Sequence, residues 1–370
     1  MSRRLRVLVL TPDYPPARGG IQLVMERLVR HWDGVDTRVL TLAATEPRPA
    51  DTDPSEVRRS RRLPGLGHAG QVAALNAHGL VEALVLRPDA VLSGHVVTSP
   101  AALAIHCLTG VPFAQYLHGE EVVARRSLTV RAMRHAAAVV AVSGHTESLA
   151  RECGADPERI HRIPPGVDPA PTPPVSRAAR PLIVTVAGLR FPYKGHDVML
   201  RALPLIRARV PDCRWIVVGD GPLRPALTRA AEALGVNDAV DFVGEVDDQA
   251  RNRWLDAAHV FTMPSRLSAR GGGEGFGIAY LEAGAHGLPV VAGDVAGARD
   301  AVVHGVTGLL VDPTDHVQVA AAIGDLLLDG ERAASMGRAG WERTGELTWR
   351  RAASRVQEVL TAMATARPRR

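Results

Sequence analysis

Leu182-Ile-Val-Thr-Val-Ala-Gly-Leu-Arg-Phe-Pro-Tyr-Lys-Gly-His196 is the stretch that decides the fold of this 370-residue chain. Its first part, 182–187, is an apolar and mostly β-branched run of the kind that forms a buried parallel strand. A glycine-containing turn follows, and a helix is predicted directly after it, over Asp197–Val210. A strand that leads through a loop into a helix predicts one βα unit of a parallel sheet, whose ligands bind at the carboxyl end of the strand.

The loop of this unit contains Lys194, the only lysine among the 44 lysine and arginine residues of the chain. Lysine is a compact point charge, whereas arginine is a planar fork, so a position that needs a point charge against a phosphate would resist the exchange. Taken alone, Lys194 could equally be a chance survivor on a solvated turn. Arg190 precedes it by four residues, and two cations at a strand end could stabilise charge on a departing phosphate.

The same strand and helix alternation runs through both halves of the chain, on either side of the proline-rich stretch Pro169–Pro181. In the first half, strands are predicted at Leu5–Leu10, Thr37–Leu42, Ala90–Leu92, Phe113–Leu117 and Val139–Val142. In the second half, they are predicted at Leu182–Ala187, Arg214–Val218, Val240–Val243, Val260–Met263, Pro289–Ala292 and Gly308–Val311. Further helices are predicted at Ile21–Trp32, Arg224–Leu234, Glu274–Gly287 and Thr348–Ala364.

Two such series predict an α/β protein of two doubly wound, Rossmann-like domains that face each other across a cleft. We expect a first domain over 1–170, a linker over 171–181 and a second domain over 182–347. The segment 348–370 is expected to form a helix that packs back on the first domain, with a frayed Arg-Pro-Arg-Arg end.

Composition narrows the function classes. The net charge of +5 and pI near 9.6 allow an anionic ligand such as a nucleotide, or an anionic membrane surface. Scattered arginines and an aromatic content of 4% argue against nucleic acid. Three widely spaced cysteines favour a reducing, cytoplasmic setting. No apolar stretch is expected to approach membrane-spanning length, so we predict a protein that is soluble or at most peripheral.

Glu274-Gly-Phe-Gly-Ile-Ala-Tyr-Leu-Glu282 is the segment with the strongest functional pattern. Its two carboxylates lie eight residues apart, one before a predicted helix and one inside it. Gly275 and Gly277 leave bare backbone amides near the helix start, which suits a diphosphate or sugar hydroxyls. A glycine-rich turn before a helix with one glutamate on its face is the structural alternative, and the pattern favours function.

Two further segments follow predicted strands of the first half. His118 comes directly after Phe113–Leu117, where it could act as a hydrogen-bond donor or a proton carrier, although a structural role is equally open. Gly19 and Gly20 precede a helix and would let the backbone approach a phosphate closely, or would simply form a tight turn. The G-x-G-x-x-G spacing, a P-loop and a zinc-type cluster of histidine and cysteine are missing from the sequence.

Together these segments resemble the retaining nucleotide-sugar glycosyltransferases of family 4, which have the two-domain GT-B fold. The resemblance covers nearly the whole chain, and its most specific part is the E-x7-E pattern of Glu274–Glu282 with its Gly-Phe-Gly-Ile core. His118-Gly-Glu-Glu-Val122 and Met263-Pro-Ser-Arg266 are similar to actinobacterial phosphatidylinositol mannosyltransferases. That similarity implies GDP-mannose as the donor, with a UDP-sugar as the alternative.

The resemblance also implies roles for individual residues. His118 would sit beside the anomeric carbon, Glu274 would contact the donor sugar, and Glu282 would contact the ribose. Arg190 and Lys194 would bind the diphosphate without a metal ion or other cofactor, and the acceptor hydroxyl would attack from the front face. The remaining donor-site residues would be Gly19 and Gly20 near the phosphates, Gly219, Gly221 and Val243 around the base, and Gly275, Phe276, Gly277 and Ile278 in the motif. The family often has arginine where Leu189 stands here, so Arg190 is one residue out of register.

The sequence does not identify the acceptor, which could be a lipid, a cyclitol or a natural product. It does not indicate the oligomeric state either. Arg125, Arg126, Arg131 and Arg134 are predicted on an amphipathic helix after His118, and Arg58, Arg59, Arg61 and Arg62 in a loop. In a lipid-modifying protein such a helix could rest on the anionic inner membrane face, and the alternative is that it is simply a solvated face. A sugar-nucleotide epimerase or hydrolase, and a nucleotide-sugar binder without catalysis, are the competing functions.

Overall fold

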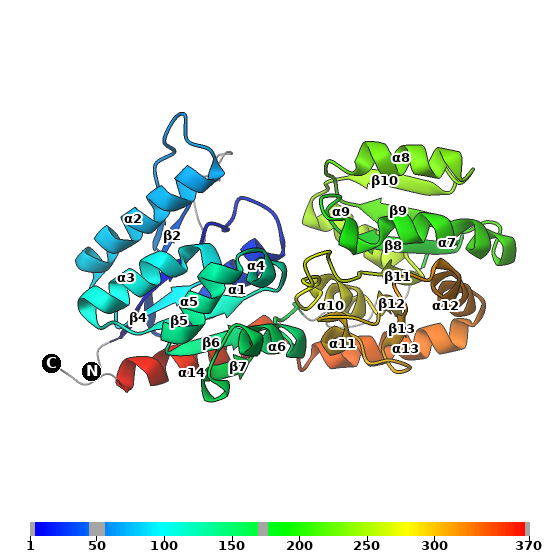
Figure 1. Cartoon of the computed structure of the whole chain (residues 1–370). Helices are drawn as coiled ribbons and strands as arrows, with labels where there is room; N and C mark the ends of the chain where they lie inside the picture. Colours follow the sequence, from blue (N-terminus) through cyan, green and yellow to red (C-terminus); the bar gives the residue numbers. More distant parts are fainter. Residues whose placement is uncertain (1–3, 44–55, 169–176, 367–370) are drawn as a thin grey trace. The chain divides into compact units, whose positions relative to one another are not determined.

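A computed structural model of the chain describes residues 4–43, 56–168 and 177–366. The chain forms two compact units (Figure 1). The first comprises Met1–Pro165 together with Trp349–Arg370, and the second comprises Gly166–Thr348. Each unit has a parallel sheet with helices packed on it, so the prediction of two Rossmann-like domains is confirmed.

The first unit has a seven-stranded sheet in the order β3-β2-β1-β4-β5-β6-β7. Its strands are β1 Leu5–Leu10, β2 Val35–Thr41, β3 Glu56–Arg59, β4 Ala90–Ser93, β5 Phe113–Leu117, β6 Ala138–Ala141 and β7 Ile160–Arg162. Its helices are α1 Gly20–Arg30, α2 His68–Leu86, α3 Ser99–Thr109, α4 Glu120–Ala124, α5 Arg126–His135, α6 Gly144–Glu152 and α14 Trp349–Thr365. Short 3-10 turns lie at η1 Val96–Thr98 and η2 Pro157–Arg159.

The central strands of this sheet were predictable because both of their faces are covered. β1 and β5 have the predicted bounds, and the five residues of β5 are all buried. The edge strands β3 and β7 were missed, and the expectation that Arg58 and Arg59 lie in a loop was wrong, because both belong to β3. Neither of these two strands has a buried residue, so neither carries a continuous apolar run.

The second unit has a six-stranded sheet in the order β10-β9-β8-β11-β12-β13. Its strands are β8 Leu182–Val186, β9 Arg214–Val218, β10 Val240–Gly244, β11 Val260–Met263, β12 Val290–Gly293 and β13 Gly308–Val311. Its helices are α7 His196–Arg209, α8 Arg224–Ala233, α9 Asp248–Ala257, α10 Ile278–Ala285, α11 Ala298–Ala301, α12 His316–Leu328 and α13 Gly330–Thr344, and η3 Pro192–Lys194 is a 3-10 turn. All six strands of the second half were predicted to within one residue.

The connections between the two units contain few described residues. Gly166 begins the second unit, where the Val167 amide donates to the Leu347 carbonyl at 2.8 Å. Residues 169–176, which include 171–176 of the linker expected over 171–181, and the final residues 367–370 lie outside the described residues. Arg177, at the end of that stretch, donates to carbonyls at the ends of α9 and α10 in the second unit. The last helix, α14, returns to the first unit, where the Trp32 indole donates to the Ala353 carbonyl at 3.1 Å.

One expectation about hydropathy was wrong. Helix α2 has 19 residues, and an 18-residue window of it has a mean hydropathy of 1.2, so it is long and apolar enough to cross a membrane by length and composition. Polar residues at Gln71, Asn76, His78 and Glu82 interrupt the apolar run when the sequence is read one residue at a time. The helix brings apolar side chains from successive turns onto one face, and that face is not apparent as a continuous run.

Candidate active site

Lys194 is fixed at the carboxyl end of the second sheet by the turn in which it lies. It ends η3, and Gly195 after it has a φ of +82°, a left-handed conformation that favours glycine. A side chain at position 195 would place its Cβ 2.2 Å from the Pro264 carbonyl oxygen, just beyond β11. The close approach of these two loops therefore requires glycine next to the lysine, and it holds Lys194 beside the end of β11.

The structure pairs Lys194 with Glu274. The Lys194 ammonium donates a short hydrogen bond to the Glu274 carboxylate, and the two side chains are only 17% and 14% exposed. Residues 80 positions apart thus place a cation and a carboxylate at one point of the sheet edge. Because an ammonium has three donors, this bond leaves two N–H groups of Lys194 for an anionic ligand.

Arg190 and Leu189 differ in where their side chains lie. Leu189 is fully buried in the core of the second unit, and its backbone bonds to the Asp220 carbonyl and the Leu223 amide hold the loop in register. Arg190 is exposed, and no hydrogen bond or ion pair joins it to the described residues. A cation at position 189 would point into the core, so in this chain the arginine available to a ligand is Arg190.

The Glu274–Glu282 segment has the predicted arrangement of a loop followed by a helix. Helix α10 begins at Ile278 after Gly277, so Glu274 lies before the helix and Glu282 just beyond its first turn. Gly275, Phe276 and Gly277 are buried, and the Phe276 side chain lies in the protein interior. Any contact of Phe276 with a ligand would therefore come from its backbone.

Glu282 has an environment that disfavours its charged form. Burial raises the pKa of its carboxyl group, and the Arg251 guanidinium, 3.6 Å away, opposes that shift. Arg251 also pairs with the exposed carboxylate of Asp248 at 3.2 Å, so Glu282 shares its cation. A group whose pKa is raised by folding stabilises the fold below its unfolded pKa, and this contribution is lost as the pH rises through the folded pKa.

Replacing Glu282 with glutamine should therefore affect stability and donor binding in opposite directions. At pH 7 the neutral amide avoids the cost of a buried carboxylate, so we expect a higher Tm than in the wild type. The difference should shrink as the pH falls, because the wild-type carboxyl becomes protonated. If Glu282 binds the ribose, the KM for the donor should rise by about tenfold, the loss of one hydrogen bond to a charged group.

Thermal unfolding from pH 4 to pH 8 and steady-state kinetics at pH 7 measure the two effects. Asp248→Asn is the matched control, because it removes the other carboxylate on Arg251 at a side chain that is 86% exposed. It should leave both Tm and KM near the wild-type values. A Glu282→Gln variant with a lower Tm at pH 7 would contradict the electrostatic argument.

The loops after β9 and β10 meet next to the loop of Lys194. Gly219 has a φ of +138°, and a side chain there would come within 2.3 Å of the Ala187 carbonyl oxygen. The Gly219 amide bonds to the Gly244 carbonyl at 2.9 Å, which brings Gly219, Gly221 and Val243 to one end of adjoining strands. The close packing of the β8 and β9 loops is a sufficient reason for glycine at position 219, whether or not a nucleotide base contacts it.

His118 lies at the carboxyl end of β5 in the first unit. Its ring Nε2 is 2.8 Å from the Gly94 carbonyl oxygen, and its backbone amide donates to the Glu121 carboxylate at 2.6 Å. Because a carbonyl can only accept, Nε2 carries a proton and the other ring nitrogen, Nδ1, is the one that can accept when the ring is neutral. The site can thus offer an acceptor to a sugar hydroxyl.

Gly19 and Gly20 lie at the start of α1, after the loop that follows β1. β1 and β5 are separated only by β4, so the loops that carry these glycines and His118 emerge from one edge of the same sheet. A side chain at Gly20 would meet no atom within 4 Å, which leaves the backbone of the helix start accessible. The first unit therefore gathers His118, Gly19 and Gly20 in neighbouring loops.

Two residues in the loops after β1 and β4, which neighbour the loop of His118, were missed in the sequence. The His95 ring lies 6.4 Å from the His118 ring, and burial lowers the pKa of His95 to about 4. Asp13 follows β1 and accepts a hydrogen bond from Gln22 at 2.9 Å. Both residues follow strand ends, as His118 does, and that position is the signal that could have identified them.

Comparisons with known proteins follow the division into two units. The family described as Glycosyltransferase Family 4 matches residues 18–171, and the family described as Glycosyl transferases group 1 matches residues 180–329. The chain is 35% identical to the GDP-mannose-dependent alpha-(1-6)-phosphatidylinositol monomannoside mannosyltransferase of Mycolicibacterium smegmatis, over 98% of this chain and 100% of that protein. It is 30% identical to the D-inositol 3-phosphate glycosyltransferase of Pseudarthrobacter chlorophenolicus, over 85% of each.

Among solved structures, a sucrose-phosphate synthase from Thermosynechococcus elongatus superimposes with a TM-score of 0.86 at 20% identity, over 99% of this chain and 100% of that one. The fold and the charged strand ends define the class of protein, a GT-B glycosyltransferase that takes its sugar from a nucleotide-sugar donor. The chain belongs to glycosyltransferase family 4.

Proposed function

We propose that this protein is a retaining, metal-independent mannosyltransferase that uses GDP-mannose and an inositol-containing lipid acceptor. The observation that carries the proposal is the Lys194–Glu274 pair at the carboxyl edge of the second sheet. A diphosphate needs a cation and a carboxylate can bind sugar hydroxyls, so this pair supports a donor site at that edge. The mannosyltransferase relative, 35% identical over nearly the whole chain, supports the donor and the acceptor class.

In the donor half of the reaction, the bond between the anomeric carbon and the diphosphate oxygen breaks, and the electron pair leaves with GDP. Lys194 and Arg190 are proposed to bind the diphosphate and stabilise the charge that develops on it, in the place of a magnesium ion. Glu274 would hold the sugar hydroxyls, Glu282 the ribose, and the loops of Gly219, Gly221 and Val243 the base. The backbone amides around Gly275–Ile278 would complete the donor site.

In the acceptor half, a hydroxyl oxygen bonds to the anomeric carbon from the face that GDP leaves. Its proton passes to the departing diphosphate oxygen, so the product keeps the configuration of the donor and no covalent enzyme intermediate forms. His118 is proposed to bind the sugar beside the anomeric carbon through Nδ1. Gly19 and Gly20 would let the acceptor or the phosphates approach the start of α1.

The proposed acceptor is an inositol lipid, because the mannosyltransferase relative is named for a phosphatidylinositol monomannoside. A free cyclitol phosphate is the second acceptor to test, since the other relative is named for D-inositol 3-phosphate. A transferase with a lipid acceptor must reach a membrane, so we propose a cytoplasmic protein that binds peripherally to the inner membrane face. The exposed arginines at 125, 126, 131 and 134 are one surface that such contact could use.

Incubation with donor alone and with donor plus acceptor tests the proposal. We expect slow release of GDP from GDP-mannose alone, and release faster by about 10²-fold or more when phosphatidylinositol monomannoside is added, because a positioned acceptor replaces a bimolecular encounter. A thermal-shift series of GDP- and UDP-sugars should show the largest stabilisation with GDP-mannose. Fast release of nucleotide that no acceptor accelerates would instead indicate a hydrolase or an epimerase.

A further inference from the structure

Helix α2 exposes an apolar face along its whole length. Its outward positions recur every three or four residues and are Ala73, Ala77, Val81, Leu84 and Val85. Val81, Leu84 and Val85 are 56%, 66% and 65% exposed, although large apolar side chains at the surface are usually scattered singly. The face is extended by exposed Leu63 and Leu66 in the preceding loop, and by Leu108 on the neighbouring α3.

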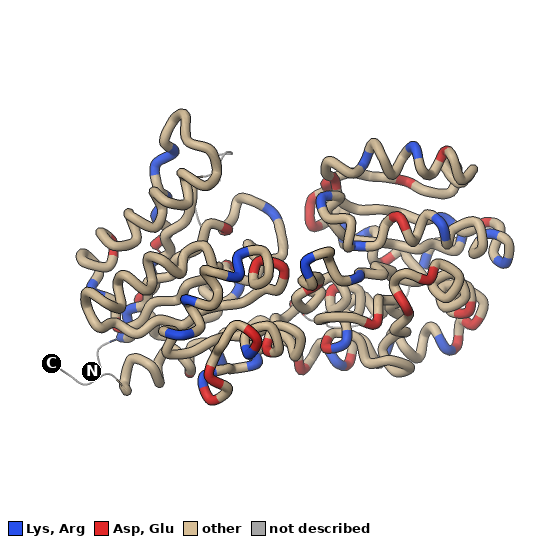
Figure 2. The backbone as a smooth tube through the Cα atoms, in the orientation of Figure 1, with Lys and Arg blue, Asp and Glu red and all other residues tan. Residues whose placement is uncertain are grey.

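Every polar side chain of α2 that bonds to other elements does so inside the unit. Gln71 bonds to the backbone of Leu63 and Leu66, which ties the preceding loop to the helix. Asn76 bonds to the Val97 carbonyl and the Ala101 amide, next to α3. The outward face is therefore left without a polar group, and Figure 2 shows α2 almost free of charged positions.

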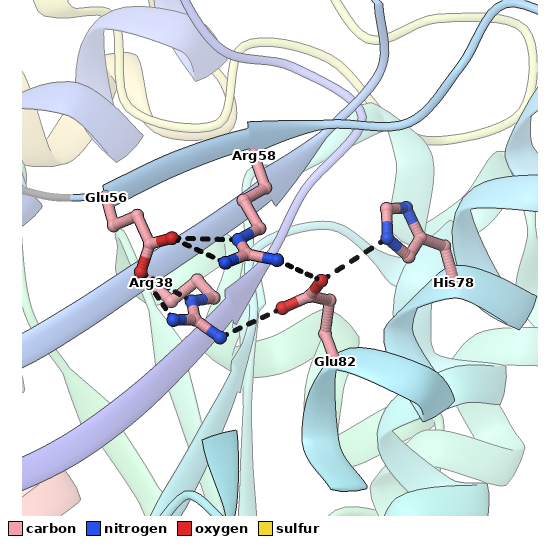
Figure 3. Close-up of polar contacts among 5 residues, drawn as sticks. All are labelled: Arg38, Glu56, Arg58, His78 and Glu82. Carbon is pink, nitrogen blue, oxygen red and sulfur yellow. Dashed lines mark hydrogen bonds and ion pairs between the residues drawn. The ribbon is translucent and has the colours of Figure 1, made fainter. Parts of the chain in front are cut away.

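The single acidic residue of α2 anchors the helix to the sheet (Figure 3). Glu82 is 3% exposed and accepts from Arg38 of β2 and Arg58 of β3, each at 3.1 Å, and His78 lies 3.4 Å away. Glu56 bonds to both arginines from the outer side. This network fixes the rotation of α2 about its axis, so the apolar face is presented to the outside.

Arginines bracket this face. Residues 57–88 contain five arginines and one glutamate, and the glutamate is the buried Glu82. Arg61 and Arg62 are exposed before the helix, and Arg87 is exposed directly after it. An apolar face between cations complements a bilayer, whose interior is apolar and whose headgroups can be anionic.

We propose that the apolar face of α2 docks onto an anionic lipid bilayer. The face consists of Leu63, Leu66, Ala73, Ala77, Val81, Leu84, Val85 and Leu108, and Arg61, Arg62 and Arg87 lie at its ends. The helix lies along the membrane surface and stays folded in the first unit. A transferase that acts on a lipid, as proposed above, needs such a membrane contact. Binding of this face to a bilayer does not depend on which donor or acceptor the protein uses. Helix α2 is favoured over α5, because the exposed positions of α5 are all polar or charged and have no apolar face between them; they are Arg126, Ser127, Arg131, Arg134 and His135.

Vesicle sedimentation with the full chain tests the proposal without any transfer assay. We expect binding to vesicles of equal parts phosphatidylglycerol and phosphatidylcholine, and weaker binding to phosphatidylcholine alone. The triple variant V81S/L84S/V85S should lower the partition coefficient by about tenfold or more. Its matched control is V306S/V317S/L328S in the second unit, where the side chains are 52%, 55% and 59% exposed, and this variant should bind as the wild type does.

Charge reversal tests the arginines separately. R61E/R62E should lower binding to the anionic vesicles by about thirtyfold. R332E/R338E, which reverses two exposed arginines of α13, changes the net charge equally and should bind as the wild type does. Release of GDP from GDP-mannose should be unchanged in every one of these variants, so a failed proposed function would be visible independently of membrane binding.

Three results would overturn the proposal. They are a wild-type protein that does not bind anionic vesicles, a V81S/L84S/V85S variant that binds them fully, and a loss of binding that is equal in the control variants. Analytical ultracentrifugation of the same proteins identifies the alternative occupant. If the wild type is a dimer and V81S/L84S/V85S a monomer with unchanged vesicle binding, a second copy of the chain covers this face instead.

Discussion

Replacing Lys194 with alanine is expected to lower kcat for sugar transfer by about 10³-fold, the upper range for losing one group that stabilises transition-state charge. Two effects combine in this variant. The diphosphate loses a cation, and Glu274, which is only 14% exposed, loses its partner and presents an unpaired carboxylate to the anionic donor. Steady-state kinetics with GDP-mannose and a saturating acceptor measure the loss, and thermal unfolding shows whether the fold is kept.

Two further variants separate charge from geometry. Lys194→Arg keeps the charge but replaces a point charge with a planar fork, so it should recover only part of the activity. Arg190→Ala removes an exposed cation that leaves no carboxylate of the described residues unpaired, so its effect should be smaller than that of Lys194→Ala. Unchanged turnover in Lys194→Ala would show that the lysine does not act on the diphosphate.

Lys194 also offers a chemical test, because it is the only lysine of the chain. An amine-reactive reagent can modify only this side chain and the amino terminus. GDP should protect Lys194 from modification and should not protect the amino terminus. Equal modification with and without GDP would argue against a diphosphate site at this lysine.

Replacing Glu274 with glutamine is expected to lower kcat by about 10²-fold, because the amide keeps the size of the side chain but loses the charge that binds sugar hydroxyls as the transition state forms. The double variant K194A/E274Q should lose little more activity than K194A alone. Residues in direct contact do not contribute independently, and in the double variant no unpaired carboxylate faces the donor.

The four proteins of this cycle are compared by kcat/KM at one pH. Losses that simply add would show that the Lys194–Glu274 contact has no role in the reaction, even if each residue has one. Glu331→Gln is a suitable control, since it removes an exposed carboxylate at the start of α13 in the same unit. It should leave kcat/KM unchanged.

How well the strands and helices could be predicted from the sequence depended on how deeply their residues are buried. The strands β1, β5, β9, β11 and β13 have the predicted bounds, because most of their residues are buried and a buried strand needs a continuous apolar run. The edge strands β3 and β7, which have no buried residue, and the apolar face of α2 do not leave such a run, and all three were missed in the sequence. The helix after His118 was expected as one element, but α4 and α5 meet at Arg125, whose backbone is not helical.

The candidate site was partly predictable for a similar reason. Residues such as Lys194, Glu274 and His118 directly follow strands or precede helices, and such positions cluster at the carboxyl edge of a parallel sheet. His95 and Asp13 follow strands too, but no recognisable motif surrounds them. Arg251 reaches Glu282 from another helix, 31 positions away, so no local pattern could indicate the pair.

The sequence by itself determined the two parallel sheets, the strand-end positions of the charged residues and the spacing of Glu274 and Glu282. These follow from local patterns, since apolar periodicity and glycine placement act within a few residues. Only the tertiary structure decided that Lys194 bonds to Glu274, that Leu189 is in the core while Arg190 is exposed, and that α2 turns its apolar face outward. Each of these depends on contacts between segments far apart in the chain. Packing and ion pairing between such segments fix the side-chain orientations, which the local sequence does not determine.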